Sequence, residues 1–204
     1  MRRSLEILCR MTAAGVCIGI AAGVYVGCPD RVAGALLFSV GLLCVIANRL
    51  SLFTGHVGFA DANPETWAYF ATMLTFNFLG AGLTGWILYA TGDRLPLIAQ
   101  GIVTAKLSRP WTGTLAGGVI CGACMYLAVL PWREQCKQAL STAITIMAVA
   151  AFILMGGEHC IADLAFLCIA GGPPDNYPST VLPWLWLAVA GNAIGALGMR
   201  WLVR

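Results

Sequence analysis

Long apolar stretches divide this sequence, separated by a small number of charged residues. Only 10% of the 204 residues are Asp, Glu, Lys or Arg, and 59% are hydrophobic. An ordinary soluble domain carries about 25% charged residues, which form its hydrated surface. This chain has too few of them to form such a surface, and it is too apolar for a disordered segment. The composition therefore indicates a membrane protein that crosses the bilayer several times.

Six apolar windows lie between the charges, and a helix needs about 20 residues to cross the hydrocarbon core. Their approximate bounds are 10–30, 32–48, 65–93, 109–133, 137–170 and 175–200. Tryptophans, which favour the membrane–water interface, stand near the window ends at Trp67, Trp111, Trp132, Trp184 and Trp201. We predict an all-α membrane protein with six transmembrane helices and one domain, residues 1–204.

The distribution of Lys and Arg predicts the orientation in the membrane. If the N-terminus is inside, eight basic residues fall on the inner side: Arg2, Arg3, Arg10, Arg49, Arg133, Lys137, Arg200 and Arg204. Four fall on the outer side: Arg31, Arg94, Lys106 and Arg109. Since inner loops carry an excess of basic residues, we expect both termini to be cytoplasmic, in a bacterial inner membrane. The basic residues form no cluster typical of nucleic-acid binding, so no nucleic-acid partner is expected.

The second and fifth windows do not have the pattern of continuous helices. The second gives way to LFTGHVG at 52–58, and the fifth is interrupted by GGEHCIAD at 156–163. Interrupted segments at corresponding places in two halves of a chain indicate a transport site built from inverted repeats.

A second correspondence supports this division. NFLGA at 77–81 and NAIGA at 192–196 stand in the third helix of each half. We predict two repeats, about 8–92 and about 110–204, and an odd number of crossings makes the second inverted relative to the first. The alternative is a chance recurrence of common small residues.

The second interruption contains three ionisable residues, Glu158, His159 and Asp163. A charged side chain at the bilayer centre costs roughly 2.5–3.5 kcal/mol on insertion scales, so such residues are usually paired or functional. The two carboxylates could instead cap the broken helix ends. Histidine can hold or release a proton near neutral pH, and its structural alternative is a buried ring bonded to Thr54 or Asn192.

Three motifs together resemble the formate/nitrite transporter family. They are Leu52-Phe-Thr-Gly55, then Gly157-Glu-His-Cys-Ile-Ala-Asp163, then Gly191-Asn-Ala-Ile-Gly195. The family has L-F-T-G, G-x-E-H-x-x-A-N and G-N-x-x-G in the same order and on the same helices. The resemblance implies an aquaporin-like six-helix protomer, a homopentamer, and one substrate pore in each protomer.

The resemblance also implies roles for individual residues. Phe38 and Leu42 match a constriction on the cytoplasmic side of the pore, and Phe152 matches one on the other side. Lys106 matches a vestibule lysine that attracts anions. The remaining positions form the central polar group and its motif: Thr54, Glu158, His159 and Asn192.

Five positions depart from the family pattern: Ser51, His56, Gly122, Gly157 and Asp163. Formate-type members have glutamate at the first, and asparagine is usual at the second, third and fifth. Glycine replaces a bulky residue at the fourth. We expect the missing side chains at Gly122 and Gly157 to widen the vestibule or to change what holds Glu158.

The resulting hypothesis is a channel or transporter for small monovalent anions of weak acids, of the formate, nitrite or hydrosulfide class. Apolar rings would exclude a bare charge, and His159 would supply a proton or a strong hydrogen bond. One alternative is an aquaporin-like channel for neutral solutes, although the two interruptions lack N-P-A. A membrane redox or haem protein is a third, limited by the presence of only two histidines. No enzyme activity, cofactor or metal is expected.

Overall fold

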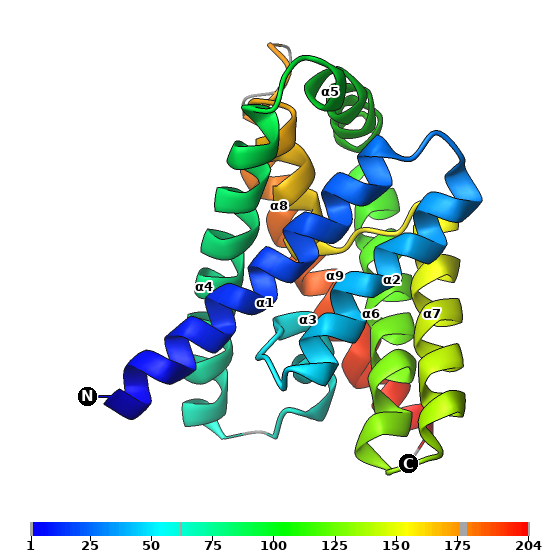
Figure 1. Cartoon of the computed structure of the whole chain (residues 1–204). Coiled ribbons are helices and arrows are strands. Elements are labelled where there is room, and N and C mark those ends of the chain that lie inside the picture. Colours follow the sequence, from blue (N-terminus) through cyan, green and yellow to red (C-terminus); the bar gives the residue numbers. More distant parts are fainter. Residues whose placement is uncertain (1, 62, 176–178, 204) are drawn as a thin grey trace.

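The computed structural model describes residues 2–61, 63–175 and 179–203, which are helical almost throughout (Figure 1). Within these ranges there is no β-strand. The α-helices are α1 (Arg2–Gly27), α2 (Arg31–Ala47), α3 (Phe53–His56), α4 (Pro64–Tyr89), α5 (Arg94–Leu107), α6 (Trp111–Arg133), α7 (Gln138–Leu154), α8 (Cys160–Ile169) and α9 (Val181–Val203). A 3-10 turn, η1 (Val57–Phe59), follows α3.

Four helices are long and apolar enough to cross a membrane, judged by length and composition. They cover Ser4–Gly27 of α1, and α4, α6 and α9 in full. The other two predicted crossings are broken, as expected from the sequence: α2 is followed by the short α3, and α7 by the ten-residue α8. The all-helical membrane fold with two interrupted segments is therefore confirmed.

The interruptions lie slightly earlier than predicted. The non-helical stretches are 48–52 and 155–159, whereas all of 53–59 and all of 160–163 form the helical turns that come next. The predicted bounds were too late because residues of the polar motif themselves form the helical turn that follows each break. The helix α5 was not predicted; it lies at the end of the protomer opposite both termini and links α4 to α6 (Figure 1).

The helix starts follow ordinary capping chemistry. Asp30 precedes α2 and accepts a hydrogen bond from the Ala33 N–H at 2.6 Å. Asn63 precedes α4, accepts from the Glu65 N–H at 3.0 Å, and is followed by Pro64. A side-chain oxygen at this position satisfies an N–H that has no partner within the helix, and proline is favoured at the first helical position.

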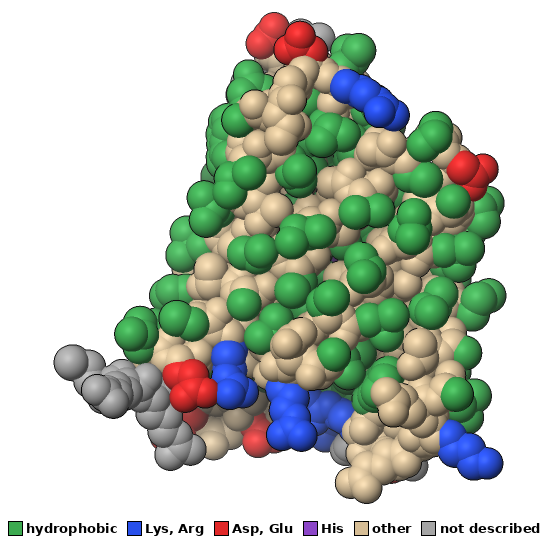
Figure 2. Space-filling model, in the orientation of Figure 1, with side chains coloured by type: hydrophobic (Ala, Val, Ile, Leu, Met, Phe, Trp, Pro, Cys, Tyr) green, Lys and Arg blue, Asp and Glu red, His purple; other side chains and the backbone are tan. Residues whose placement is uncertain are grey.

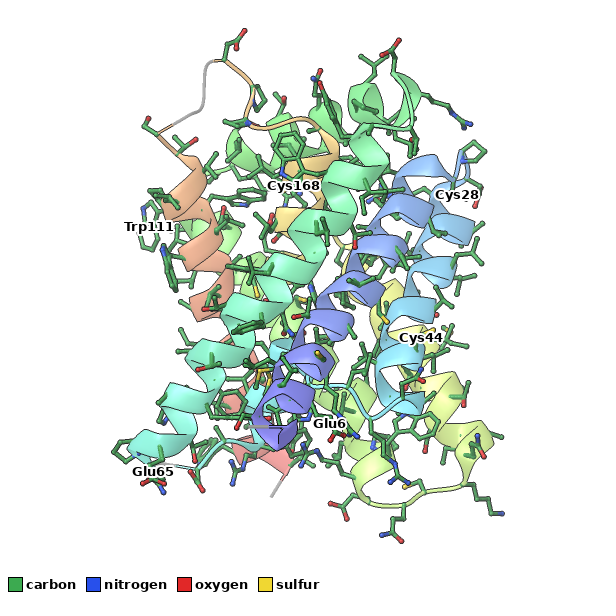
Figure 3. The ribbon with its side chains drawn as sticks, turned by 60° about the vertical axis from the view of Figure 1, so that its left-hand side comes forward. Glu6, Cys28, Cys44, Glu65, Trp111 and Cys168 are labelled. Carbon is green, nitrogen blue, oxygen red and sulfur yellow. The ribbon has the colours of Figure 1, made fainter. Side chains whose placement is uncertain are left out.

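The outer surface is divided as a membrane protein requires. In the face shown, charged side chains gather towards the two ends, and the middle is apolar (Figure 2). Glu6 and Glu65 lie near the end that carries the termini, and Cys28 near the other (Figure 3). Large exposed apolar side chains include Leu36, Leu83, Trp86, Ile120 and Ile194. Such a surface is stable only against hydrocarbon or another apolar protein face.

Glycines allow the long helices to approach closely. A Cβ on Gly195 of α9 would overlap the Val119 carbonyl of α6, and a Cβ on Gly80 of α4 would overlap the Thr12 carbonyl of α1. Small residues at crossing points are the usual way in which helices pack in lipid.

Gly195→Ala is therefore expected to lower stability, by the roughly 1–3 kcal/mol typical of an overpacked contact. Gly198→Ala is the matched control, because it lies on the same helix and a Cβ there has open space. Thermal unfolding in mild detergent should separate the two variants. Equal melting temperatures would show that α6 and α9 can move apart without cost.

In the first half of the chain, Asn77 of α4 holds the start of the half-helix α3. Its amide oxygen accepts from the Phe53 N–H at 2.8 Å. Its amide nitrogen donates to the carbonyls of Met11 and Ser51, at 2.7 and 2.9 Å. The bonds to Phe53 and Ser51 satisfy backbone groups that the break in the helix leaves free, as burial in a membrane requires. The bond to Met11 connects the same side chain to α1.

Asn192 of α9 makes the corresponding bonds in the second half. Its oxygen accepts from the Cys160 N–H at 3.0 Å, at the start of α8. Its nitrogen donates to the carbonyls of Gly118 and Glu158, at 3.0 and 2.6 Å. The matching pattern at Asn77 and Asn192 is what a duplicated three-helix unit would produce, and the inverted duplication itself stays a prediction.

Candidate functional site

His159 lies at the centre of the protomer, where α8 begins. Its Nδ1 accepts from the Ala162 N–H at 3.2 Å, so the ring caps its own helix. Because a backbone N–H can only donate, the neutral ring carries its proton on Nε2. That nitrogen lies 2.9 Å from Thr54 Oγ1, at the start of the other half-helix. The two broken segments therefore meet through one hydrogen bond between Thr54 and His159.

Two phenylalanines close the space around this ring. Phe152 stacks on His159 with centroids 5.8 Å apart, and Phe38 meets it edge-on at 6.5 Å. The two phenylalanine rings are themselves in T-shaped contact at 6.3 Å. All three side chains are at most 2% exposed, as is Leu42 one turn after Phe38. Phe38 and Phe152, expected at constrictions on opposite sides of the pore, thus pack against the same histidine.

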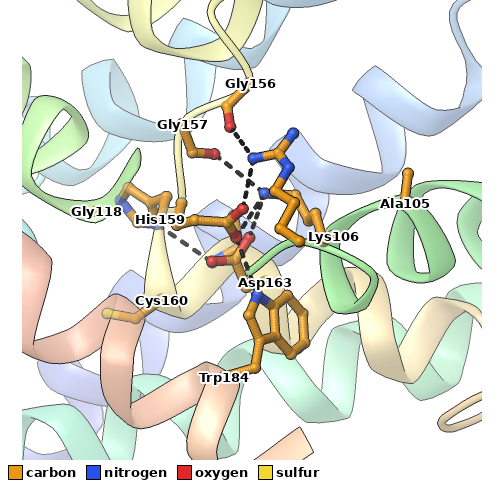
Figure 4. A network of polar contacts seen from close by, with 12 residues as sticks. Ala105, Lys106, Gly118, Gly156, Gly157, His159, Cys160, Asp163 and Trp184 are labelled. Atoms are coloured by element: carbon orange, nitrogen blue, oxygen red, sulfur yellow. Dashed lines mark hydrogen bonds and ion pairs between the residues drawn. The ribbon is translucent and has the colours of Figure 1, made fainter. Parts of the chain in front are cut away.

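Glu158 is completely buried and is held by three donors (Figure 4). Lys106 Nζ lies 2.9 Å from Oε2, and Arg109 Nη1 lies 2.8 Å from Oε1. Trp184 Nε1 donates to Oε2 at 3.1 Å. Glu158 therefore does not cap a helix end; it is the acceptor at the centre of a buried ion cluster, whose desolvation cost is offset by these partners.

Lys106 joins this cluster to Asp163. Its ammonium also lies 3.0 Å from Asp163 Oδ1 and donates to the Gly157 carbonyl at 3.0 Å. Its three protons thus have three protein partners, and the residue is only 7% exposed. The expected free vestibule cation is instead a paired cation. Asp163 is 1% exposed, and its Oδ2 has no hydrogen-bond partner among the described residues.

Two cavities extend from opposite ends of the protomer towards the group formed by His159, Phe38 and Phe152. The α5-side cavity, about 170 Å³, is lined by Arg31, Lys106 and Arg109 among others and extends to Gly157. The termini-side cavity, about 220 Å³, is lined by Arg49, His56 and Arg133, and it extends to Leu42 and Gly55. Both are lined by cationic side chains, and the aromatic group around His159 separates them.

Of the two effects expected of Gly122 and Gly157, a wider vestibule is not supported by their packing, and a change in what holds Glu158 stays a prediction. A Cβ on Gly122 would overlap the backbone of Asn192. One on Gly157 would lie 3.0 Å from the Phe152 carbonyl oxygen and 3.4 Å from Cys121 Cβ. Neighbouring backbone has moved into the space that a side chain would fill, so the missing side chains bring helices together instead of opening a passage.

Sequence reasoning did not identify Arg109 and Trp184 as site residues. Arg109 was placed only among the outer basic residues, and Trp184 only among the interfacial tryptophans. Arg109 follows Lys106 by three residues but lies just after the end of α5, so no helix periodicity in the sequence pairs the two cations. Nothing in the local sequence of Trp184 points to Glu158, which is 26 residues away.

The described residues contain no group of three or more His, Cys, Asp or Glu that could hold a metal ion. Both ring nitrogens of His159 have partners within the protein. An axial bond from His159 to a haem would require it to give up one of them.

Comparison with known proteins gives consistent matches over most of the chain. Formate channel FocA of Haemophilus influenzae is 23% identical over 176 residues, which are 74% of this chain and 61% of that protein. Formate channel FocB of Escherichia coli is 24% identical over 197 residues, 79% of this chain and 69% of that protein. The chain thus spans less than two thirds of the length of the first relative.

Solved structures show the same fold. A pentameric formate channel with formate bound is 24% identical, with a TM-score of 0.82 over 99% of this chain and 98% of that one. An FNT family ion channel is 19% identical, with a TM-score of 0.87 over 100% of this chain and 92% of that one. The family model described as formate/nitrite transporter matches residues 2–204. Because that match spans nearly the whole chain, the protein belongs to the formate/nitrite transporter family.

Proposed function

We propose that this protein is a transmembrane channel or transporter for small monovalent anions of weak acids, of the formate, nitrite or hydrosulfide class. We further propose that passage is linked to protons through His159. The observation that carries the proposal is the position of His159, a titratable ring inside an apolar group that separates two cationic cavities. Family membership supports the same class of function.

The geometry suggests how an anion would cross. In the α5-side cavity it meets Arg31, since Lys106 and Arg109 are both already paired with Glu158. The aromatic rings are a barrier to a bare charge, because nothing in them replaces its water. His159 and Thr54 supply the polar contact inside this barrier. If the anion takes up one proton to pass and releases it on the other side, each anion carries one proton across.

We also propose a homopentamer with both termini cytoplasmic, in a bacterial inner membrane. One solved relative is described as a pentameric formate channel, and the apolar outer surface supplies the faces for lipid and neighbouring protomers. The small anion, the bilayer and other copies of the chain would then be its partners. Native mass spectrometry in mild detergent tests the assembly, and a monomer or trimer would contradict it.

Uptake into proteoliposomes tests the transport proposal. Formate, nitrite and hydrosulfide should each be offered across a pH series, with empty liposomes as the control. We expect uptake of at least one anion, increasing as the external pH falls, because a lower pH supplies the proton that crosses with it. Passage of water or glycerol without any of the anions would instead favour the aquaporin-like alternative. A haem absorption band in the purified protein would favour the redox alternative.

A further inference from the structure

The two histidines use their ring nitrogens in opposite ways. His56 Nδ1 lies 2.9 Å from the Leu52 carbonyl, which can only accept, so the proton is on Nδ1. No hydrogen bond to His56 Nε2 is found within the described part of the chain, and the ring lines the termini-side cavity. His56 can therefore gain a proton on Nε2 without losing a hydrogen bond. His159 would have to give up its bond to the Ala162 N–H.

The surroundings of His56 are cationic. Arg49, just after α2, and Arg133, at the end of α6, line the same cavity of about 220 Å³. No Asp or Glu is among the described residues that line it. The Arg133 guanidinium lies 3.9 Å from the centre of the Phe59 ring, so an aromatic face and not a carboxylate holds it in place.

The remaining helices packed against α3 add no opposite charge to this cavity. Neither α4 nor α9 contributes a lining residue. The nearest basic residue of α9, Arg200, donates to the Ala60 carbonyl, and Glu65 of α4 is exposed in the first turn of its helix. Two guanidinium groups without a counter-ion disfavour a third positive charge on His56, unless an anion enters with the proton.

We propose that the termini-side cavity is a binding site for one small monovalent anion, held by Arg49, Arg133 and the protonated His56. The inference rests on the proposed transport function and adds a second substrate site to it. Because linkage is reciprocal, the anion favours protonation of His56, and protonation of His56 strengthens anion binding to the same extent. Affinity should therefore rise as the pH falls through the range in which His56 takes up its second proton.

Histidine-selective NMR tests this directly, since the chain has only two histidines. The signal that disappears in His56→Gln identifies His56 in the wild-type protein. Its titration should be followed in phosphatidylcholine nanodiscs, first in gluconate, a much bulkier anion than formate, and then in formate at the same ionic strength. We expect formate to move the His56 midpoint to higher pH by about one unit, the effect of an opposite charge within contact range.

Two comparisons make the result specific. In the Arg49→Gln/Arg133→Gln variant the His56 signal should remain, and the displacement caused by formate should be lost. If either variant fails to assemble, titration of wild-type His56 with increasing nitrite supplies the same measurement without substitution. A His56 midpoint that is the same in gluconate, formate and nitrite would overturn the proposal.

The same cations could bind the phosphate of a lipid headgroup, and the lipid composition separates the two sources. Nanodiscs with added phosphatidylglycerol should leave the His56 midpoint in gluconate unchanged. A His56 midpoint that changes with the phosphatidylglycerol content, and not with added formate, would overturn the proposal of a small-anion site. The measurement does not require transport, so an anion-dependent midpoint together with absent uptake would refute the proposed transport function and leave this site standing.

Discussion

Replacing Lys106 by methionine is expected to destabilise the protein by about 3–5 kcal/mol, the usual cost of removing one partner from a buried ion pair. The variant keeps most of the side-chain volume but leaves Asp163 without its cation and Glu158 with Arg109 as its only charged partner. Both carboxylates are at most 1% exposed, so water cannot replace the ammonium. Thermal unfolding in mild detergent should show a large loss.

The double variant Lys106→Met/Asp163→Asn is the control. It removes the carboxylate that the single variant leaves uncompensated, and asparagine is the residue that the family pattern has at this position. Part of the lost stability should therefore return. A Lys106→Met protein with the wild-type melting temperature and a weakened anion affinity would contradict this prediction, because it would show an unpaired cation that acts by attracting anions from a distance.

Replacing His159 by asparagine is expected to abolish the part of the pH dependence of uptake that comes from protonation of the histidine ring. Asparagine is a good N-cap residue, so the variant can still accept from the Ala162 N–H and keep α8 in place. It has no titratable proton to lend. Without the titratable group the pore is also expected to leak anions such as chloride, which a proteoliposome flux assay would measure.

Two further variants separate chemistry from structure at this position. His159→Leu removes both the cap and the proton, so it should assemble less well than His159→Asn. Thr54→Val removes only the partner of Nε2 and should produce a milder defect in uptake. A correctly assembled His159→Asn oligomer with wild-type uptake at every pH would refute proton coupling through His159.

Much of the architecture could be predicted because it depends on local properties of the chain. The length of each apolar window determines whether a helix can cross the bilayer, and those lengths correctly indicated α1, α4, α6 and α9. The two interruptions were visible because polar residues at mid-membrane are costly. The central pair of Thr54 and His159 followed from family motifs whose positions on two broken helices suggested that they meet.

The pairing of the polar and charged side chains at the site could not be predicted in this way. Lys106 and Glu158 are 52 residues apart, and Trp184 follows Glu158 by another 26. Whether a lysine near a helix end faces water or two carboxylates depends on how α5, α8 and α9 pack, and no local pattern contains that information. For the same reason the glycines at 122 and 157 suggested open space, whereas the packed helices show that neighbouring backbone occupies it.

The sequence by itself determined the membrane environment, the four long apolar helices, the two breaks and the family, because these depend on hydrophobic length and on short motifs. Only the tertiary structure decided which nitrogen of each histidine carries the proton. That choice depends on the direction of one N–H at Ala162 and one carbonyl at Leu52. Backbone direction is set where helices start and end in the packed protein, so two histidines with the same side chain carry their protons on opposite sides of the ring.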